Sequence, residues 1–461
     1  TPQLRFAHRR GFKMPINIAI IGSGPAGFYT ADALTRACKG CHIDIIERLP
    51  TPFGLVRAGV APDHQTTKRV VKKFEKTALL DEVNYYGNVT IGNCVSLAEL
   101  RELYDAVVLA VGAPNDRKLT IPGADKIGVH GSAAFVGWYN GHPDYQDLRP
   151  ELNVGTAAVI GVGNVALDIA RVLVCSAERM AGSDLPDYAS CAIQGSPIYD
   201  IHLFGRRGPI EAKFTNVELR EMGKLNCSVP LAKAEQIPGD DDPVLATLSD
   251  RDRRLSERNL KTLRTFSLNR PDEKSKRVHF EFCAAPVEVL GGDRVEALRF
   301  ERTQVTDGRA EGTGDFFEVD CGLVVAAIGY RSDPIVGAPY EGDRGIIPND
   351  DGRVAKGLYT VGWIKRGPTG VISSNRYDGE VVADYIHKDF GNLPKSDKAG
   401  RKGLESLFNA RGIRYVTYAD WKQLETMEIE NATGVAPRRK FVTIEEMLKA
   451  LDKSAPSREF A

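Results

Sequence analysis

The sequence is poor in cysteine: only eight occur among 461 residues, and they are scattered along the chain. So low a cysteine content is typical of a protein in a reducing compartment. Cys38 and Cys41 have the CxxC spacing of a thiol redox centre, but no second CxxC follows, and the eight histidines are scattered as well. The sequence therefore predicts no metal site.

The sequence also lacks an excess of positive or negative charge, and it contains no long uninterrupted apolar run. The 61 Lys and Arg residues balance 61 Asp and Glu residues, so attraction to a charged partner must come from a local patch. This balance argues against general nucleic-acid binding. The longest apolar stretch, 156–175, is interrupted by Asn164, Asp168 and Arg171 and is therefore no transmembrane segment. The length and the 42% hydrophobic content are ordinary for a globular protein of two or three domains.

The strongest motif begins with the apolar run 16–21, which is typical of a strand buried on both faces. Gly22-x-Gly24-x-x-Gly27 follows directly and opens a helical pattern. In this fingerprint the first glycine makes a tight turn, and the second lets the backbone approach a pyrophosphate. The third lets the helix pack closely against the strand. The phosphates then lie at the positive end of the helix dipole.

A second apolar strand, 43–46, ends at Glu47, which lies at the offset of about 20 residues that this fingerprint requires. A carboxylate at that place accepts hydrogen bonds from an adenosine ribose. The first motif therefore predicts a dinucleotide site, and its acidic residue is suited to FAD.

A second glycine motif of the same type occurs later in the sequence. The apolar strand 156–160 leads into a Gly161-x-Gly163 turn, and Ala166 takes the place of the third glycine. The later strand 199–204 is followed by Arg206 and Arg207 where the first unit has an acid. Because two guanidinium groups bind a 2′-phosphate that a carboxylate would repel, this second site is predicted to bind NADPH.

Two such units predict an α/β fold with two Rossmann-like dinucleotide-binding domains, the NADPH domain being inserted in the FAD domain. The predicted boundaries are 1–13 for an N-terminal extension, 14–112 for the first FAD-domain segment, 113–329 for the NADPH-binding domain, and 330–461 for the second FAD-domain segment with the C-terminal region. Apolar patterns predict further helices at 68–80, 214–222, 251–266 and 443–451, and further strands at 85–92, 104–112, 321–330 and 357–363. Strands 277–282 and 295–303 are predicted to be antiparallel, and a helix is predicted to open within 365–372.

Prolines and glycines in the segment 50–64 exclude regular structure, although several of its residues are too apolar for a solvated loop. A rigid apolar loop at this place is suited to covering a flat ring system.

Longer motifs resemble those of the adrenodoxin reductase family, which includes bacterial ferredoxin–NADP reductases. They are the loop that ends in Pro62-Asp63-His64, the turn Gly205-Arg206-Arg207-Gly208-Pro209 and the segment 362–372, which begins Gly362-Trp363. The resemblance runs from about residue 16 to the C-terminus with the motifs in order. It implies a two-domain flavoprotein with a glutathione-reductase-like fold, which carries electrons from NADPH through FAD to a small [2Fe–2S] ferredoxin.

The resemblance also implies roles for single residues. Positions that match the family's FAD contacts, beside Gly22, Gly24 and Gly27, are Ala26, Glu47, Leu55, Ile91, Trp363, Gly370, Val371 and Ile372. Positions that match its NADP contacts are Val162, Gly163, Asn164, Val165, Arg206, Arg207, Glu218 and Gly370. His64 and Asp168 match a pair at the domain boundary close to the flavin. Arg220 and Arg254 match basic positions that dock the acidic ferredoxin, which commonly supplies a cytochrome P450.

The catalytic candidates His64, Asp168 and Trp363 have supporting roles, because hydride transfer between two bound rings needs no protein nucleophile. His64 either relays protons or is an ordinary hydrogen-bonded loop residue. Trp363 either gates the nicotinamide site or packs over the flavin.

Three other functions stay open. A disulfide reductase would need a cysteine pair beside the flavin, and Cys38 and Cys41 fall far from that place in the predicted fold. A flavin monooxygenase would use the same two nucleotides. A nucleotide sensor would bind them without turnover.

Residues 1–13 contain five basic residues and no acidic one. They are either the remnant of an organelle-targeting segment or an extension that precedes a translation start at Met14, and we favour the second reading. The compartment predicted is the bacterial cytoplasm, with the mitochondrial matrix as the alternative.

Overall fold

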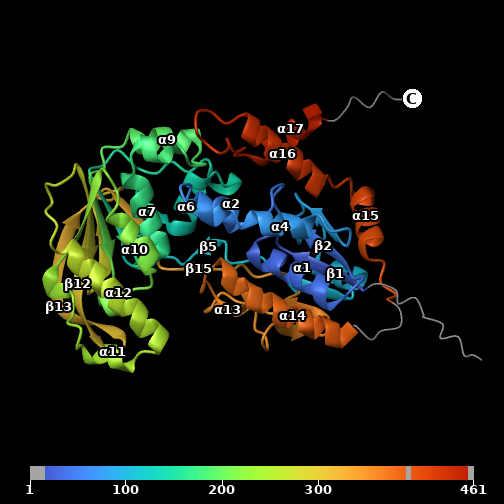
Figure 1. Ribbon diagram of the computed structural model, residues 1–461, viewed down its shortest axis with the longest axis horizontal. Helices are drawn as coiled ribbons and strands as arrows, with labels where there is room; N and C mark the ends of the chain where they lie inside the picture. The colour runs from blue at the N-terminus through green and yellow to red at the C-terminus, as the bar shows by residue number, and fades with distance from the viewer. Residues whose placement is uncertain (1–15, 391–395, 455–461) are drawn as a thin grey trace, which may run out of the picture.

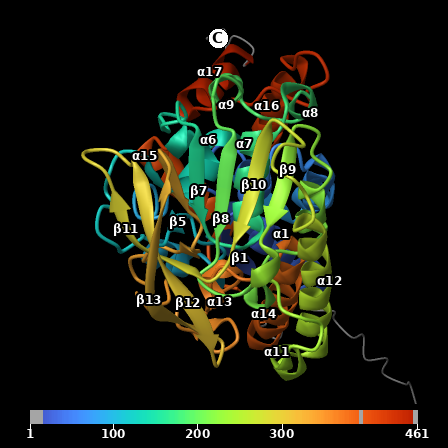
Figure 2. The same ribbon diagram turned by 90° about the vertical axis from the view of Figure 1, so that its left-hand side faces the viewer.

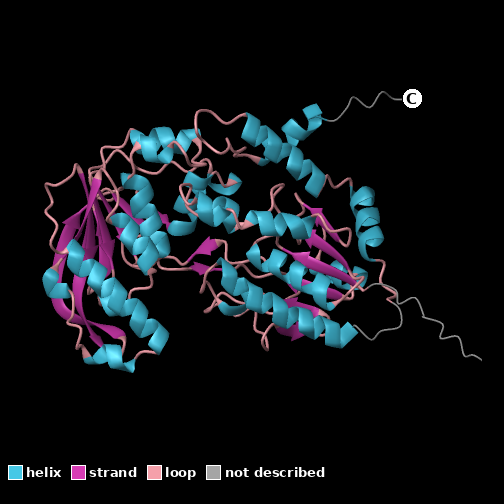
Figure 3. Cartoon of the chain, in the orientation of Figure 1, coloured by secondary structure: helices cyan, strands magenta, loops and turns pink. Residues whose placement is uncertain are grey.

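The computed structural model describes residues 16–390 and 396–454, and the basic arm 1–13 lies outside these ranges. Two six-stranded sheets form the centres of two α/β units that lie beside each other (Figure 1). Helices flank both sheets, as the colouring of Figure 3 shows. The predicted α/β fold with two Rossmann-like units is confirmed.

The first sheet has the order β16-β17-β4-β1-β2-β3 and is parallel except between β16 and β17. Its strands are β16 (Arg353–Ala355), β17 (Leu358–Thr360), β4 (Ala106–Leu109), β1 (Asn17–Ile21), β2 (His42–Ile46) and β3 (Val83–Tyr86). As predicted, β17 returns to this sheet after the second unit and pairs with β4. The carboxyl ends of β1 and β2 meet at one edge, which is where open parallel sheets bind ligands.

The second sheet has the order β6-β14-β7-β8-β10-β9, and all of its neighbours are parallel. Its strands are β6 (Val129–Gly131), β14 (Leu323–Ala326), β7 (Thr156–Ile160), β8 (Asp200–Phe204), β10 (Lys276–Glu281) and β9 (Ser228–Ala232). Figure 2 shows β7, β8, β10 and β9 side by side. The prediction that 277–282 is an antiparallel strand is therefore wrong. The segment before β10 contains a long helix that supplies the crossover which parallel strands need.

Two smaller sheets complete the second unit. The strands β11 (Ala284–Leu290), β12 (Ala297–Thr306) and β13 (Arg309–Asp320) are antiparallel, as predicted for 295–303. The short strands β5 (Asn115–Asp116) and β15 (Tyr330–Arg331) pair where the chain enters and leaves the second unit. The exact domain boundaries stay a prediction, which this sheet membership supports.

Helices cover the sheets on both sides. In the first unit, α1 packs against α14, although the two are far apart in sequence (Figure 1). The helices that precede the second unit are α1 (Pro25–Ala37), α2 (Leu55–Ala58), α3 (Gln65–Lys68), α4 (Val71–Ala78) and α5 (Leu97–Leu103). Those of the second unit are α6 (Ser132–Asn140), α7 (Asn164–Val174), α8 (Ala177–Met180), α9 (Asp187–Gln194), α10 (Asn216–Met222), α11 (Pro243–Thr247) and α12 (Asp250–Phe266). The last are α13 (Trp363–Arg366), α14 (Asn375–Phe390), α15 (Gly400–Arg411), α16 (Tyr418–Glu430) and α17 (Ile444–Ser454).

Four local predictions differ from the structure. The helix predicted at 68–80 is divided into α3 and α4, because the amides of Arg69 and Val70 donate to carbonyls three residues back and tighten the backbone. The strand predicted at 85–92 ends at Tyr86, because the backbone of Gly87 leaves the sheet to pair with Val416.

The segment 50–64, predicted to be irregular, contains the helical turn α2. Gly54 begins this turn at a φ of 49°, and glycine adopts such a positive φ without strain. The helix expected within 365–372 begins only at Asn375, after the short α13.

None of the helices within 16–390 and 396–454 is long and apolar enough to cross a membrane.

Candidate functional site

The turn after β1 has the geometry that a bound pyrophosphate needs. Gly22 has a φ of +106°, and a Cβ on it would lie 2.5 Å from the carbonyl oxygen of Ala110. A Cβ on Gly27 would lie 2.0 Å from the carbonyl oxygen of Gly22, so only glycine allows this close approach of helix and turn. Gly24, in contrast, has no atom within 4 Å of a built Cβ, which leaves open space in front of the N-terminus of α1. This cradle fits the phosphates of a dinucleotide.

Glu47 lies at the carboxyl end of β2, beside this turn. Its carboxylate accepts hydrogen bonds from the amide and hydroxyl of Ser23, at 2.9 and 2.7 Å, and from the amide of Leu49 at 3.2 Å. These bonds fix the carboxylate next to the phosphate cradle. The position matches the ribose contact predicted for FAD, which stays a prediction for this residue.

The remaining candidate FAD residues come from several segments of the first unit. A Cβ on Gly54 would lie 3.1 Å from the Cα of Gly24, so the segment that carries Leu55 touches the glycine turn directly. Leu55 is 41% exposed, a high value for a leucine inside a folded domain. Ile91 packs against the cluster of buried residues on the other side of the sheet. Ala26, in α1, is buried and would lie 2.7 Å from a Cβ on Gly362.

Trp363 begins α13, directly after Gly362. Its indole nitrogen donates to the carbonyl oxygen of Thr369 at 3.1 Å, and its ring stacks on Tyr330 with 5.7 Å between centroids. Tyr330 belongs to β15, where the chain leaves the second unit, so the stack joins the two units. The hydrogen bond and the stack hold the indole in place, and the two interpretations of Trp363, packing over the flavin and gating the nicotinamide site, both stay predictions.

Gly370, Val371 and Ile372 follow in the segment between α13 and α14. Gly370 has a φ of +85°, and Val371 is 56% exposed. The amide of Val371 donates to the hydroxyl of Ser374 at 3.1 Å. This exposed apolar stretch at the sheet edge is available to a ring system.

The second glycine turn repeats the first. A Cβ on Gly161 would lie 2.3 Å from the carbonyl oxygen of Ala327, whereas Gly163 has open space around a built Cβ. Gly163 is followed by α7, whose N-terminus faces that space. The side-chain oxygen of Asn164 accepts from the amide of Thr215 at 2.7 Å. Val162 and Val165 are half-buried on the same turn.

Arg206 and Arg207 follow β8 at the carboxyl edge of the second sheet. The side chain of Arg206 is exposed and has no partner among the residues that the structure describes. Within the part of the chain that the structure describes, the one hydrogen bond that the Arg207 side chain donates goes to the carbonyl oxygen of Gly308, at 3.2 Å. Both guanidinium groups therefore retain donors for an anionic ligand beside the second turn, as a 2′-phosphate requires.

The structure brings His64, Asp168 and Glu218 together between the two units. Nε2 of His64 lies 3.2 Å from Oε2 of Glu221 and 3.5 Å from Oε2 of Glu218. Its Nδ1 lies 3.9 Å from Oδ1 of Asp168. Burial raises the pKa of Asp168 and of Glu218. His64 is therefore hydrogen-bonded and faces carboxyl groups that can carry protons, and both proposed roles of this histidine stay compatible with its position.

Arg171, fully buried in α7, holds this cluster together. Its Nη1 lies 2.7 Å from Oδ1 of Asp168, and its other nitrogens donate to Asp63 at 2.8 and 3.0 Å. Burial alone would raise the pKa of Asp63, but the hydrogen bonds and charge of Arg171 outweigh it and lower that pKa. Carboxylates in turn raise the pKa of Arg171 despite its burial.

The atoms of His64, Asp168 and Glu218 that could ligate a metal lie within 4.8 Å of one another. A cation already occupies this environment, because Nη1 of Arg171 lies 2.7 Å from Asp168 and 3.6 Å from Glu218. A metal ion here would meet the guanidinium charge at close range. The prediction of no metal site stays a prediction, which this geometry supports.

Sequence reasoning missed three residues of this region: Arg171, Glu221 and Tyr330. Arg171 carried a signal, because it interrupts an apolar helix three residues after Asp168 and so shares its helical face. Glu221 carried a similar signal, because it lies three residues after Glu218 in α10. Tyr330 carried none, because its partner Trp363 comes from a segment that is distant in sequence.

The docking candidates Arg220 and Arg254 belong to the neighbouring helices α10 and α12. Both side chains are exposed, and neither has a partner among the described residues. Arg258 and Lys261 are exposed on α12 as well, at helical spacing. Exposed basic side chains thus lie on both α10 and α12, and Asp250, Asp252 and Glu257 are exposed on α12 as well.

Cys38 and Cys41 lie between the end of α1 and the start of β2. Both are buried, and burial raises the pKa of Cys38 to about 11 and that of Cys41 to about 12. Thiols with such pKa values are protonated near pH 7 and are poor nucleophiles. They do not have the character of a redox centre.

Residues 16–185 match the model of the pyridine nucleotide-disulphide oxidoreductase family. The chain is 40% identical over 464 residues to the mitochondrial NADPH:adrenodoxin oxidoreductase of Arabidopsis thaliana, covering 95% of each chain. It is 40% identical over 451 residues to the human enzyme of the same name, covering 94% of this chain and 91% of that one. It is 38% identical to the NADPH-ferredoxin reductase FprA of Mycobacterium tuberculosis, covering 94% and 99%.

The solved structure of Mycobacterium tuberculosis FprA in complex with NADPH is similar to this one, with a TM-score of 0.90. The similarity covers 95% of this chain and 99% of that chain. The whole architecture, both nucleotide turns included, is therefore shared with a structure that holds NADPH.

Proposed function

The chain belongs to the family of NADPH:adrenodoxin oxidoreductases and NADPH-ferredoxin reductases, and we propose that it transfers electrons from NADPH through FAD to a [2Fe–2S] ferredoxin. One observation carries the proposal. The two glycine turns have similar geometry, yet the strand beside the first, β2, is followed by Glu47, whereas the strand beside the second, β8, is followed by Gly205 and Arg206. This contrast suits a dinucleotide with a free ribose in one cradle and a 2′-phosphorylated one in the other.

The cofactor residues fit this assignment. Bound FAD would accept hydride from NADPH and release the electrons singly, which is the chemistry that a one-electron iron–sulfur acceptor needs. The protein's part is to place the two rings against each other and to keep water and side reactions out. The stacked pair of Trp363 and Tyr330 and the buried cluster around Arg171 lie between the two units, where they can fix that alignment.

The acceptor is proposed to be an acidic ferredoxin that docks on Arg220 and Arg254. The support is electrostatic. Because the net charge of the chain is zero, an acidic partner must be attracted by a local group of basic residues, and these two exposed arginines lack partners among the described residues. A cytochrome P450 downstream of that ferredoxin completes the proposal.

For the compartment we propose the bacterial cytoplasm, with the mitochondrial matrix as the alternative. Similar proteins come from both settings, since they include a Mycobacterium tuberculosis enzyme and several named as mitochondrial.

Anaerobic titration tests the function. The FAD-loaded protein should lose its flavin absorbance on addition of NADPH and regain it on addition of an oxidised [2Fe–2S] ferredoxin. No bleaching by NADPH would point to a nucleotide sensor. Bleaching followed, in air, by peroxide release and slow ferredoxin reduction would point to a monooxygenase.

A further inference from the structure

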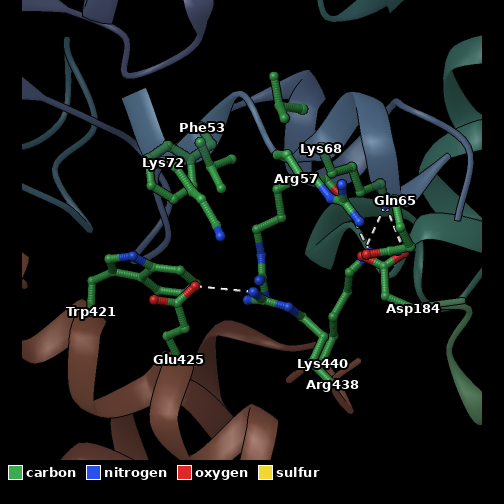
Figure 4. A pocket seen from close by; sticks show the side chains of 13 residues that line it. Phe53, Arg57, Gln65, Lys68, Lys72, Asp184, Trp421, Glu425, Arg438 and Lys440 are labelled. Carbon is green, nitrogen blue, oxygen red and sulfur yellow. Dashed lines mark hydrogen bonds and ion pairs between the residues drawn. The ribbon is translucent and has the colours of Figure 1, made fainter. Parts of the chain in front are cut away.

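A pocket lies between the helices α2–α4 and the helix α16 near the C-terminus. It has a volume of about 180 Å³. Its cationic lining consists of Arg57, Lys68, Arg69, Lys72, Arg438 and Lys440, whereas only Asp184 and Glu425 supply negative charge to the lining. Figure 4 shows these side chains converging from the two sides, with Phe53 and Trp421 beside them. We call this set the basic pocket.

The innermost part of the basic pocket holds two buried lysines that share one carboxylate. Nζ of Lys68 lies 2.6 Å from Oδ1 of Asp184, and Nζ of Lys440 lies 3.0 Å from Oδ2 of the same residue. The side chain of Lys440 is only 1% exposed. It also donates to the carbonyl oxygens of Arg57 and Asn140, at 3.2 and 3.0 Å. Burial holds the pKa of Lys440 well below its usual value, because the single carboxylate of Asp184, which Lys68 shares, does not offset it.

The side wall repeats this arrangement with arginines. Arg57 and Arg438 share the fully buried carboxylate of Glu428, with nitrogen–oxygen distances of 2.9 and 3.3 Å. Arg438 reaches Glu425 as well, at 3.0 Å. Glu425 in turn pairs with Lys422, so each of these carboxylates is shared by at least two cations.

The mouth of the basic pocket carries two more cations, Arg69 and Lys72. Both side chains are exposed, and neither side chain has a hydrogen bond or ion pair with any residue in the described part of the chain. In Figure 4, Lys72 extends from α4 toward the space beside Trp421.

With all six lining cations protonated, they exceed the carboxylates Asp184, Glu425 and Glu428 by three; burial lowers the pKa of Lys68 and of Lys440, which weakens the positive charge that these two contribute until an anion enters. The additional cation Lys422 has Glu75 as a further partner, at 2.6 Å, and so leaves this excess unchanged. Uncompensated positive charge in a partly buried cavity is costly, and an anion that enters the cavity removes the cost.

We propose that the basic pocket is a binding site for a small tetrahedral oxyanion of the phosphate class, either inorganic phosphate or a phosphomonoester. The chemistry of the lining supports this class, because guanidinium and ammonium groups converging from several directions match an anion with acceptors on all sides. The anion would join α2–α4, the segment around Asp184 and the C-terminal residues 425–440. It would thereby fix the C-terminal region against both α/β units.

The test is isothermal titration of the FAD-loaded protein with inorganic phosphate at constant ionic strength. Saturating NADP⁺ is present throughout, so that the 2′-phosphate site beside Arg206 is filled. One phosphate should bind per chain. The double variant Arg69→Gln, Lys72→Gln should weaken binding by about tenfold or more, because each lost charged hydrogen bond removes a contact that is strong in proteins.

The matched control is Lys39→Gln, Lys402→Gln, which removes two exposed cations that also lack partners among the described residues and lie outside the pocket. It should bind phosphate as the unaltered protein does. Flavin absorbance and NADPH oxidation of both double variants should be unchanged, because their exposed, unpaired side chains carry no structural contact.

A second readout separates specific binding from general screening. Measured at a pH above the second pKa of phosphate, where the free ligand is already a dianion, an oxyanion next to Lys440 and Lys68 should raise the pKa of these lysines, so binding should take up protons and its measured heat should vary with the ionisation enthalpy of the buffer. Tighter binding of glycerol phosphate than of inorganic phosphate would assign the site to phosphomonoesters, and the reverse would assign it to the free ion. A response that chloride reproduces, or equal phosphate affinity in Arg69→Gln, Lys72→Gln and the unaltered protein, would overturn the proposal.

Discussion

Arg171 and Asp63 form a two-point ion pair across the boundary of the two α/β units. Nε of Arg171 donates to Oδ2 of Asp63 at 2.8 Å, and Nη2 donates to Oδ1 at 3.0 Å. The arginine side chain is fully buried and that of the aspartate is 7% exposed. Asp63 directly precedes His64, so the pair connects the helix of the second nucleotide turn to the loop that carries the histidine.

Replacing Arg171 with glutamine should destabilise the protein strongly. The change leaves the buried carboxylates of Asp63 and Asp168 without their cation, and removing one partner of a buried pair costs about 3–5 kcal/mol. The measurement is the free energy of unfolding of the FAD-loaded protein in urea. Asp63→Asn together with Arg171→Gln should lose less than the sum of the two single variants.

Arg414→Gln is the control for that series. Its partner Asp452 is 64% exposed and its own side chain is 46% exposed, so this ion pair should contribute little. A loss of stability in Arg171→Gln no larger than in Arg414→Gln would show that the buried pair does not connect the units.

Replacing Arg206 and Arg207 with alanine should weaken NADPH selectively. Charged hydrogen bonds contribute about 1.5–3 kcal/mol each, so KM for NADPH should rise by at least about tenfold while KM for NADH stays unchanged. Steady-state dye reduction with both nucleotides measures this. An unchanged preference for NADPH over NADH would refute the assignment of the second site.

Reversing Arg220 and Arg254 to glutamate should slow ferredoxin reduction and flatten its dependence on salt. The reversal removes the attraction that steers an acidic partner, and salt screens such attraction. Reduction of a small uncharged dye should be unaffected, because the flavin is not altered. Lys39→Glu, Lys402→Glu changes the net charge equally at other places and should leave ferredoxin reduction intact. Equal losses with dye and ferredoxin would exclude a docking role.

The two nucleotide turns were predictable because their geometry depends on local contacts. A Cβ on Gly27 would lie 2.0 Å from the carbonyl oxygen of Gly22, so the requirement for glycine is visible in the sequence itself. The acid at 47 and the arginines at 206–207 follow their strands directly, and parallel strands place such residues at one edge.

The boundary cluster and the basic pocket could not be predicted in this way. Their members come from segments that meet only after both sheets have formed, as Asp184 meets Lys440. The prediction that β10 is antiparallel was wrong for a related reason. Whether a strand pairs in parallel depends on crossovers such as α12, and the residue pattern of the strand itself does not show this.

The buried side chain of His202, in β8, makes the stability of the protein depend on pH. Its ring stacks on that of His279 in β10, with 4.2 Å between centroids, and His279 in turn contacts Asp200 at 2.8 Å. Nδ1 of His202 is buried without a hydrogen-bond partner in the described part of the chain. Burial lowers the pKa of His202 to about 4. The neighbouring charges of His279, Lys233 and Arg277 lower it as well, against the opposite effect of Asp200.

Lowering the pH from 7 to 5 should therefore destabilise the folded protein through His202. In the unfolded chain this histidine has a pKa of about 6.5 and binds a proton in that range, whereas the folded protein does not, so falling pH favours unfolding by on the order of 1 kcal/mol. Replacing His202 with phenylalanine should remove this part of the pH dependence, as measured by urea unfolding at both pH values. His387→Gln, at an exposed helical position, should leave it unchanged. The same pH dependence in His202→Phe as in the unaltered protein would show that His202 takes up its proton equally in the folded and unfolded states.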